Sequence, residues 1–432
     1  MAIHRKLFFL LIVFLPTQLG LHVWPEWSYV LGRRIDYLSP TIYFTDILII
    51  LTLIYWGHES LPKRRQILYL PTWKSIGIGI AVVALIFINI YFAKSPQIAI
   101  YKWAKVIEYL CLGWYIIHSR VKVSTILLPI SIAVVISSLL AIWQFILQHS
   151  LGGVFWVIGE RTFVLDTPGV ARFTLCLPNE YSCRMLVRPY ATFPHPNVLG
   201  GFLAVTLPYL VYPLVYNKKN RWLTTAVVLV ALIGLFISFS RSAWFVGLLA
   251  GGVSYAILRK KASLDTSFSF IKQYISPLLL VCFFVITLIL FFPAASDESI
   301  VRRQELQRSA VAIWQYSPIT GVGLGNFLVS LPGVFSNRAG NFLQPVHNIY
   351  MLWFAETGLM GVFGILLILL LFRQRLMQMF FHPGALRSDY VVLLFPVVGM
   401  YLLGFVDHYP VTLQQGQLLF TLCLSLFLGR RT

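Results

Sequence analysis

The run Pro345-Val346-His347-Asn348-Ile349-Tyr350-Met351-Leu352-Trp353-Phe354-Ala355-Glu356-Thr357-Gly358 decides the fold, because it opens an apolar segment that continues to about Phe372. A segment of this length can cross the hydrocarbon core of a bilayer as a helix. Two polar side chains, His347 and Asn348, stand at its beginning, where they are costly unless they line a wet site. We therefore expect a membrane helix with a functional group at its N-terminal end.

Apolar runs of similar length recur along the whole chain. Hydrophobic residues make up 58% of it and charged residues only 11%, whereas soluble domains are about a quarter charged. The mean hydropathy is +0.78. This composition predicts an all-α, polytopic integral membrane protein and excludes an ordinary soluble domain. The net charge of +19 would suit nucleic acid, but in a membrane protein it is explained by the positive-inside bias, so no nucleic-acid partner is expected.

We expect twelve membrane-spanning helices. They cover roughly residues 7–23, 41–57, 75–93, 99–117, 124–147, 197–216, 222–240, 242–258, 274–292, 348–372, 390–407 and 412–428. The first run has no small-residue cleavage site, so we expect it to be a span and not a signal peptide.

The connections suggest three segments. Residues 1–147 form the N-terminal membrane helices, 148–372 form a catalytic core with two long loops, and 373–432 form the C-terminal membrane helices. The long loops, about 148–196 and 293–347, are rich in aromatic and apolar residues, so we expect them to be ordered and to face outward.

The basic residues divide unequally between the two sides of this topology. Twenty of the 34 lie in short connections on the side of both termini, which is therefore expected to be cytoplasmic. Eleven of the fourteen on the other side are arginine, whereas nine of the twenty inside are lysine. Arginine holds phosphate at two points and stays charged. An outer face rich in arginine predicts a phosphorylated, membrane-anchored ligand; arginines kept for lipid headgroups are the alternative.

Histidines supply the candidate reactive groups. His347 can take a proton from a sugar hydroxyl near neutral pH; the alternative is an interfacial histidine bonded to a carbonyl. His195 lies between two prolines in Phe193-Pro194-His195-Pro196-Asn197. It is either a rigid wall of a binding site or a cap of the following span, and the sequence leaves both open.

Arginines supply the candidate anion-binding groups. Arg241, in Ser240-Arg241-Ser242, is wedged between two spans near membrane level and needs an anionic partner there. A partly amphipathic helix over about Ser299–Tyr316 carries Arg302, Arg303 and Arg308. The three do not form one stripe, and one or two of them can reach a phosphate. The full set of candidate substrate-binding residues is Arg241, Arg303, Arg308, His195, Asn348 and Arg188.

The chain has no Asp-x-Asp motif, and its nearest approach is the adjacent pair Asp297-Glu298. A divalent metal that holds a diphosphate usually needs clustered carboxylates. We therefore expect no metal ligands, no cofactor and a metal-independent transfer in which arginines neutralise the leaving group. Glu356 lies nine residues after His347 and is expected to face away from it as a structural residue. The glycines of Gly321-x-Gly323-x-Gly325 follow no strand, so they indicate a tight turn and not a nucleotide-binding loop.

Two of the five cysteines, Cys176 and Cys183, share the first long loop. If that loop is outside the cytoplasm, an oxidising compartment favours a disulfide between them. The other three fall in expected spans and are interpreted as packing residues.

These residues carry a resemblance to the O-antigen ligase family of bacterial membrane proteins, which includes O-antigen polymerases and protein O-oligosaccharyltransferases. It covers about residues 190–365. The matching pieces are Phe193-Pro194-His195-Pro196-Asn197-x-x-Gly200, Ser240-Arg241-Ser242-Ala243-Trp244, Arg303 with Pro318, Gly321-Val322-Gly323-Leu324-Gly325-Asn326-Phe327, and His347-Asn348 with Ala355-Glu356-Thr357-Gly358-x-x-Gly361.

The resemblance implies a membrane glycosyltransferase of the cell envelope. Family members move a glycan from an undecaprenyl-diphosphate carrier to an acceptor, as in lipopolysaccharide synthesis, on the outer face of the cytoplasmic membrane. By position, His347 matches the family's catalytic histidine, and Arg241 and Arg303 match its essential arginines. The expected partners are the carrier-linked glycan donor, a glycan or glycolipid acceptor, and the lipid bilayer.

Two other functions remain open. A surface-polysaccharide polymerase would use a second carrier-linked glycan as its acceptor. A lipid-glycan flippase or transporter would need charged residues deep within several spans, and the few candidates are Asp46, Lys102, Lys105, Glu108 and Asp407.

Overall fold

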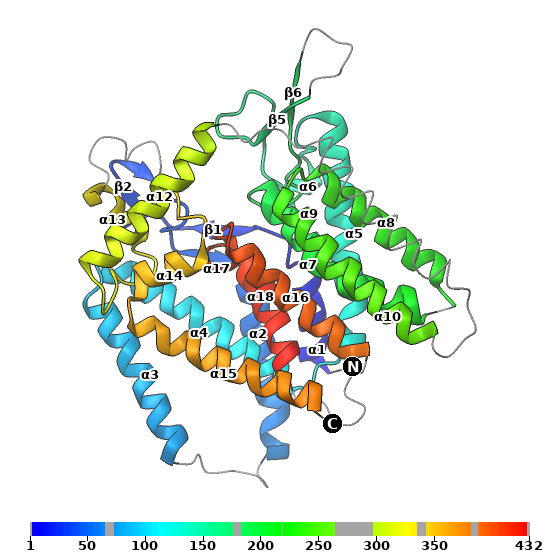
Figure 1. Cartoon of the computed structure of the whole chain (residues 1–432), viewed down its shortest axis with the longest axis horizontal. Coiled ribbons are helices and arrows are strands. Elements are labelled where there is room, and N and C mark those ends of the chain that lie inside the picture. Colours follow the sequence, from blue (N-terminus) through cyan, green and yellow to red (C-terminus); the bar gives the residue numbers. More distant parts are fainter. Residues whose placement is uncertain are drawn as a thin grey trace.

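The computed structural model describes residues 2–64, 73–175, 183–217, 219–263, 297–334, 343–381 and 388–429, and it is mostly helical. Figure 1 shows the helices gathered around a central group that contains α7, α16 and α18. The helices are α1 Ile3–Val13, α2 Phe44–Arg64, α3 Trp73–Tyr91, α4 Pro96–His118, α5 Val123–Leu147, α6 Val154–Val157, α7 Pro196–Tyr216, α8 Arg221–Ile237, α9 Arg241–Gly247, α10 Val253–Ser263, α12 Asp297–Tyr316, α13 Phe327–Val334, α14 Ile349–Thr357, α15 Met360–Phe381, α16 Ser388–Gly404, α17 Tyr409–Thr412 and α18 Gln414–Leu428. A π-helical turn, Leu248–Gly252, joins α9 to α10.

Several of these helices are membrane-like in length and composition. In the described part of the chain, four are long and apolar enough to cross a bilayer: Val123–Leu147, Pro196–Tyr216, Arg241–Arg259 and Met360–Gln378. Shorter apolar helices cover Gly77–Tyr91, Arg221–Ile237, Tyr390–Gly404 and Gln414–Leu428. A helical membrane protein is confirmed, whereas the number of twelve spans remains a prediction. The expected span 274–292 lies outside the described residues.

Two expected spans are not single helices. The expected span 7–23 is wrong as a single helix. Helix α1 ends at Val13, and the chain later forms strand β1. Pro16 lacks an N–H and disfavours helical backbone before it, which explains this early end. The second, 348–372, is split into α14 and α15 at Gly358, which has a φ of +58°. A Cβ at Gly358 would lie 2.5 Å from the carbonyl oxygen of Ile319.

The connections contain short strands that the all-α expectation missed. β1 (Gly20–His22) pairs with β4 (Thr41–Tyr43), β2 (Tyr29–Val30) with β3 (Arg33–Arg34), and β5 (Arg172–Leu175) with β6 (Arg184–Val187), all antiparallel. Each pair has at most four residues a strand, too few for a clear alternating pattern in the sequence. A short 3₁₀ helix, Glu26–Ser28, precedes β2.

The helix expected over about Ser299–Tyr316 is confirmed as α12. Its apolar positions Leu306, Ala310 and Ile313 are buried, whereas Arg308 on the same helix is exposed. They belong to a small core with Phe327 and Leu352. One face of α12 is therefore held against α13 and α14. Helix α14 is the helix that directly follows His347 and Asn348 in sequence.

The three glycines after α12 form the tight turn that the sequence predicts. Gly321, Gly323 and Gly325 all have positive φ. A Cβ at Gly323 would lie 2.3 Å from the Cβ of Ala93, and one at Gly325 would lie 2.5 Å from Cγ of Lys102. The turn thus allows Ala93, just after α3, and Lys102 of α4 to approach its backbone closely.

Asn89 on α3 fixes this turn. Its Nδ2 donates to the carbonyl oxygens of Thr320 (2.8 Å) and Glu356 (3.0 Å), and its Oδ1 accepts from the indole N–H of Trp103 (2.8 Å) and the N–H of Leu324 (3.0 Å). We expect Asn89→Leu to destabilise the protein by roughly 1–3 kcal/mol, because it leaves buried donors unsatisfied. Thermal unfolding in detergent, followed by tryptophan fluorescence, measures this.

The control for Asn89→Leu is Ile88→Leu, which changes the exposed neighbour on the same helix. It should unfold at the wild-type temperature. An Asn89→Leu protein as stable as this control would show that the turn does not depend on the amide.

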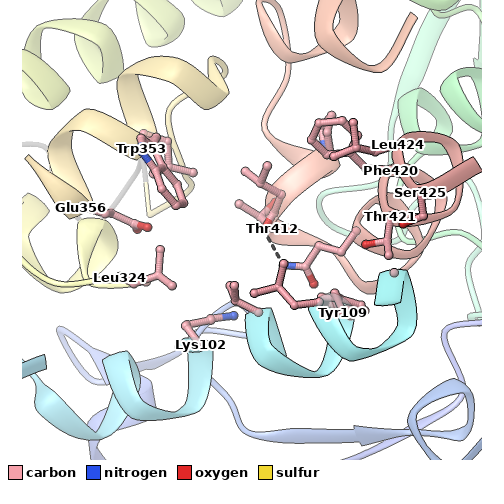
Figure 2. Close-up of a pocket in the computed structure, with 18 of the residues that line it drawn as sticks. Lys102, Tyr109, Leu324, Trp353, Glu356, Thr412, Phe420, Thr421, Leu424 and Ser425 are labelled. Atoms are coloured by element: carbon pink, nitrogen blue, oxygen red, sulfur yellow. Dashed lines mark hydrogen bonds between the residues drawn. The ribbon is translucent and has the colours of Figure 1, made fainter. Parts of the chain in front are cut away.

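A cavity of about 480 Å³ lies between α4, α18 and the α14–α15 segment. Figure 2 shows Lys102 and Tyr109 of α4 on one side, Trp353 and Glu356 of α14 on another, and the end of α18 on a third. The floor is the contact between α4 and α18, where Gly113 faces Ser425 closely enough that a Cβ would lie 2.8 Å from its hydroxyl oxygen.

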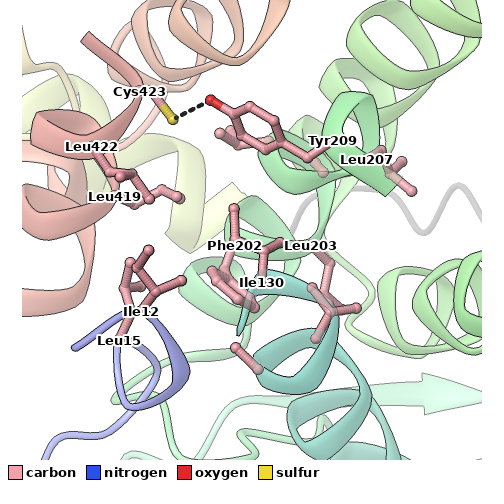
Figure 3. Packing of buried hydrophobic residues seen from close by; sticks show 14 of the residues in the cluster. Ile12, Leu15, Ile130, Phe202, Leu203, Leu207, Tyr209, Leu419, Leu422 and Cys423 are labelled. Carbon is pink, nitrogen blue, oxygen red and sulfur yellow. Dashed lines mark hydrogen bonds between the residues drawn. The ribbon is translucent and has the colours of Figure 1, made fainter. Parts of the chain in front are cut away.

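The main hydrophobic core is built around α7, most of whose residues are buried. Figure 3 shows Phe202 and Leu203 of α7 facing Ile130 of α5, with Leu419 and Leu422 of α18 on the other side. The Tyr209 hydroxyl lies 3.7 Å from the sulfur of Cys423. This core makes α7 a fixed support for the polar residues at its N-terminus.

Candidate active site

Four polar residues from three parts of the chain meet near the N-terminal ends of α7 and α14. His347 directly precedes the capping residue of α14, Asp407 and His408 join α16 to α17, and Asn197 lies in the first turn of α7. The donor atoms of His347, Asp407 and His408 lie within 4.8 Å of one another. We call these four residues the histidine–aspartate cluster.

Tyr409 holds the loop of Asp407 and His408 against α7. Gly201 of α7 leaves room for it, because a Cβ there would lie 1.7 Å from the Tyr409 hydroxyl oxygen. Only glycine permits this approach, so the packing of α7 fixes where the carboxylate of Asp407 lies.

Asp407 is buried, and both oxygens of its carboxylate accept hydrogen bonds. Its Oδ1 accepts from the backbone N–H of His408 at 2.8 Å, and its Oδ2 accepts from Nδ2 of Asn197 at 3.1 Å. Arg188 donates to Oδ1 of Asn197 at 2.7 Å and to the carbonyl oxygen of Ser238 at 3.0 Å. A continuous polar chain therefore runs from Arg188 through Asn197 to Asp407.

His347 is the partner of this carboxylate. Its Nδ1 lies 3.5 Å from Oδ1 of Asp407, within ion-pairing distance, and its side chain is 18% exposed. The carboxylate favours a proton on Nδ1, so Nε2 carries the lone pair. Nδ1 makes no hydrogen bond in the described structure, but a histidine whose Nδ1 faces a buried carboxylate is the arrangement that proton abstraction through Nε2 requires.

The electrostatics keep one negative charge in the cluster. Burial alone would raise the pKa of Asp407, but its interactions with His347 and His408 outweigh burial and hold the pKa well below its usual range. Burial lowers the pKa of His408 to about 4, against the effect of Asp407. Burial and the nearby Arg188 lower the pKa of His195 to about 3. At neutral pH, Asp407 is therefore ionised and both of these histidines are neutral.

Two of the four expected arginines, Arg188 and Arg303, reach the cluster or its neighbours, and a third, Arg241, lies near Arg188. Arg188 is part of its polar chain. Burial lowers the pKa of Arg188 to about 10, and the charge of the nearby Arg241 adds to this effect. Arg303 donates to the carbonyl oxygen of Val406 at 3.4 Å, next to Asp407. Arg308 is exposed, and in the described part of the chain the structure shows no hydrogen bond or ion pair between it and the cluster. We call Arg188, Arg241 and Arg303 the arginine group.

Two other candidate residues cap helices. Asn348 is the N-cap of α14, because its Oδ1 accepts from the N–H groups of Tyr350 and Met351, both at 3.0 Å. Its Nδ2 donates to the carbonyl oxygen of Phe405. His195 is the N-cap of α7, since its Nδ1 accepts from the N–H of Asn197 at 3.1 Å. Of the two possibilities that the sequence left for His195, the cap is therefore present. The cap Asn348 directly follows His347, and the cap His195 lies two residues before Asn197, so both caps position cluster residues.

Asp407, His408 and Asn197 are cluster residues that the sequence did not identify as site residues. Asp407 appeared there only as a charged residue of a hypothetical transporter. The signal that could have found it is Asp407-His408-Tyr409-Pro410, a polar pair at the end of an apolar run, just as His347-Asn348 stands at the start of one. Asp407 and His408 also come from 373–432, outside the segment expected to form the core.

Glu356 has the structural role that the sequence assigned to it. Its Oε1 accepts from the N–H of Phe327 at 3.3 Å, which ties α14 to the start of α13. Cys183 is disulfide-bonded, but Cys176 lies outside the described residues, so the pairing of the two remains a prediction.

The fold and the cluster define a helical membrane protein with a paired histidine and carboxylate beside a group of arginines. Residues 226–366 match the family model described as O-antigen ligase, which confirms the resemblance seen in the sequence. The matched segment contains Arg241, Arg303 and His347. No curated protein matches the chain.

The family comprises membrane enzymes of the O-antigen ligase and polymerase type. The match therefore indicates, in general terms, a glycosyltransferase-like membrane enzyme of polysaccharide biosynthesis, which acts on lipid-linked glycans and glycan acceptors.

Proposed function

We propose that the protein is a metal-independent, inverting glycosyltransferase that moves a glycan from an undecaprenyl-diphosphate carrier to an acceptor hydroxyl. The observation that carries this proposal is the 3.5 Å approach of Nδ1 of His347 to the buried carboxylate of Asp407, set beside the arginine group. The family match over residues 226–366 supports the reaction class.

The reaction follows from the roles of these groups. Nε2 of His347 takes the proton of the acceptor hydroxyl, and the oxygen attacks the anomeric carbon from the face opposite the carrier. A glycosidic bond forms while the bond from the anomeric carbon to the phosphate oxygen breaks. The electron pair leaves with the diphosphate, whose negative charge Arg241 and Arg303 stabilise. Asp407 stabilises the imidazolium that forms on His347.

The proposed setting is the cytoplasmic membrane with both termini in the cytoplasm. In the twelve-span topology, His347, Arg188, Arg241 and Arg303 all fall on the outer side. The carrier enters sideways from the bilayer. The shared location of these residues in one cluster supports a single outward-facing site.

A metal is the alternative to arginine at this site, because the donor atoms of His347, Asp407 and His408 are close enough to share an ion. Both Asp407 oxygens accept N–H donors, and Nδ1 of His408 lies 2.7 Å from the Thr412 hydroxyl. These bonds leave a second lone pair on each carboxylate oxygen and Nε2 of each histidine as ligands, so the choice between metal and arginine rests on the test below.

We expect EDTA to leave glycan transfer unchanged, because the arginine group provides the positive charge. The measurement is transfer by the purified protein with EDTA, compared with the same preparation after dialysis. Activity that disappears with EDTA and returns with Mg²⁺, Mn²⁺ or Zn²⁺ would contradict the metal-free reaction.

A polymerase is the second candidate function. It would use a second carrier-linked glycan as acceptor, and the cavity of about 480 Å³ beside α4 favours it because its mostly apolar lining offers room for part of a second lipid. Incubation with labelled donor alone separates the two functions. A polymerase makes longer carrier-linked chains, whereas a ligase needs a distinct acceptor.

The transporter is supported less well by the structure. Three of its charged candidates pair with one another: Nζ of Lys105 lies 2.6 Å from Oδ1 of Asp46 and 2.7 Å from Oε2 of Glu108. These distances indicate a closed structural network that joins α2 and α4.

A further inference from the structure

A polar cavity of about 260 Å³ lies beside the larger, apolar one. Its wall is built from the connection between α1 and α2, the first turns of α4, and the end of α17 with the start of α18, together with Arg161 and Pro194. All the residues in this wall lie outside 226–366, the segment that the family model matches. The family match therefore does not explain this cavity.

The connection between α1 and α2 is fixed against α4 by hydrogen bonds. The Tyr101 hydroxyl of α4 accepts from the N–H of Thr41 on β4 at 3.1 Å and donates to the carbonyl oxygen of Thr41 at 3.3 Å. The Thr41 hydroxyl lies 2.9 Å from Nδ1 of His22 on the paired strand β1. The polar side chains of this connection are therefore held at defined positions beside α4.

Three glutamine side chains in the wall are oriented by the main chain. Nε2 of Gln18 donates to the carbonyl oxygen of Gly159 at 3.0 Å, and Nε2 of Gln415 donates to that of Thr17 at 2.9 Å. Gln417 donates in the same way to a backbone carbonyl oxygen at 2.6 Å. In the described part of the chain, the structure shows no donor to the three amide oxygens, so they are available as acceptors.

A carboxylate and a guanidinium group complete the wall. Asp36 is exposed, lines the cavity and lies close enough to Tyr37 and Tyr43 for its charge to act on both phenols. Among the described residues, no hydrogen bond or ion pair engages its carboxylate. Arg161 is also exposed and donates to the carbonyl oxygen of Pro194 at 3.4 Å. Asp36 can accept from two hydroxyl groups, and Arg161 has further N–H groups to donate.

The two lysines in the wall interact with carboxylates outside the cavity. Lys105 pairs with Asp46 at 2.6 Å and with Glu108 at 2.7 Å. Lys102 interacts with Glu356, which lines the apolar cavity. The lysines therefore bring no uncompensated positive charge for an acidic ligand.

The groups left for a ligand are mostly acceptors. In the described wall, three amide oxygens and the Asp36 carboxylate stand against the guanidinium of Arg161. A suitable ligand must therefore bring hydroxyl donors, of which an uncharged sugar has several. A sugar with a carboxylate would instead bring more acceptors and a second negative charge beside Asp36, which costs free energy.

The polar cavity adjoins the histidine–aspartate cluster. Tyr37 packs edge-on against the ring of His408, with centroids 5.4 Å apart, and the Thr412 hydroxyl lies 2.7 Å from Nδ1 of His408. Both Tyr37 and Thr412 line the cavity. The rings of His408 and His347 are 5.1 Å apart. A ligand in the cavity would therefore lie on the approach to the proposed base.

We propose that the polar cavity is a specificity site for one uncharged, hydroxyl-rich sugar of the acceptor, which Asp36 and Arg161 select. Asp36 accepts from two neighbouring hydroxyl groups, Arg161 donates to another sugar oxygen, and the glutamine oxygens accept from the remaining hydroxyls. Sugars that carry a carboxylate are rejected. This inference rests on the proposed transferase function and deepens it, because it names the class of sugar whatever anchors the acceptor.

The test measures the binding of methyl glycosides to the purified full-length protein by saturation-transfer NMR. Glucose, galactose, mannose and N-acetylglucosamine supply the neutral probes, and glucuronic and galacturonic acid supply the acidic ones. We expect a neutral glycoside to bind about tenfold more tightly than the acidic ones, the usual effect of one charged hydrogen bond. His347→Ala should bind the same glycoside as the wild type does, because it leaves the wall intact.

The variants test the two selecting residues. Asp36→Asn and Arg161→Gln should each weaken binding of the neutral glycoside by about tenfold. Asp36→Asn should also reduce the preference over the acidic glycosides, which a merely structural role would not change. The controls are Glu26→Gln and Arg172→Gln, which alter exposed charges in the same two connections away from the cavity. Both should bind as the wild type does, and the unfolding temperature is recorded for every variant.

The other results distinguish the inference from the proposed function. If no neutral glycoside binds, or if the two variants bind as tightly as their controls, the specificity site is rejected, while glycan transfer still decides the transferase. An acidic glycoside that binds as tightly as the neutral ones would also overturn the inference. Neutral binding that depends on Asp36, in a protein that forms no glycosidic bond, would support the site and reject the transferase.

Discussion

His347→Ala is expected to reduce glycan transfer by about 10²- to 10⁴-fold, the usual contribution of a positioned general base. The alanine removes the group that accepts the acceptor's proton, while Asp407 keeps its bonds to His408 and Asn197. The protein should therefore still insert into the membrane and bind its donor. The measurement is the transfer rate of the purified variant, with membrane content and unfolding temperature recorded alongside.

A matched control is His149→Ala. This histidine is exposed, and among the described residues its side chain has one hydrogen-bond contact, to the carbonyl oxygen of the next residue. It should transfer at the wild-type rate. Near-normal transfer by His347→Ala would overturn the assignment of the base, and an equal loss in both variants would trace the effect to something other than the cluster.

Asp407→Asn should lower the rate constant kcat by a similar factor of about 10²- to 10⁴-fold, because the neutral amide no longer stabilises the imidazolium on His347. Asp407 acts through His347 and is a positioning residue. We therefore expect KM for the donor to change little, since the arginine group is intact. Steady-state kinetics separates the two parameters.

The control is Asp166→Asn, an exposed aspartate in the first long connection. A purely structural role for Asp407 would lower stability and raise KM together with the loss of kcat. That result, or a wild-type kcat in Asp407→Asn, would show that the carboxylate does not serve the base.

Local sequence patterns explain why much of the fold was predictable. The bounds of α4, α5 and α7 lie within a few residues of the expected spans, because long apolar runs with few charges have one stable form in a bilayer. The breaks at Val13 and Gly358 were missed. The first depends on a proline after the helix, and the second on a backbone contact with Ile319 that the sequence does not show.

The site was predictable only in part, for a physical reason. His347, Arg241 and Arg303 stand out because polar groups at membrane level are costly. Asp407 stands out in the same way, but its partner is sixty residues away in sequence. The pairing depends on how Tyr409 packs against Gly201, which only the three-dimensional arrangement determines.

The most direct test of the central claim uses the lipid-linked glycans and the glycolipids extracted from the membranes of the source cells, which supply donor and acceptor. The purified protein is incubated with both, and released undecaprenyl diphosphate and new glycosidic bonds are counted together. We predict equal amounts of both products with the wild type, inverted configuration at the new bond, and a yield of both that is about 10²- to 10⁴-fold lower with His347→Ala. Movement of the lipid across the membrane without a new bond, or equal product from the wild type and His347→Ala, would contradict the account.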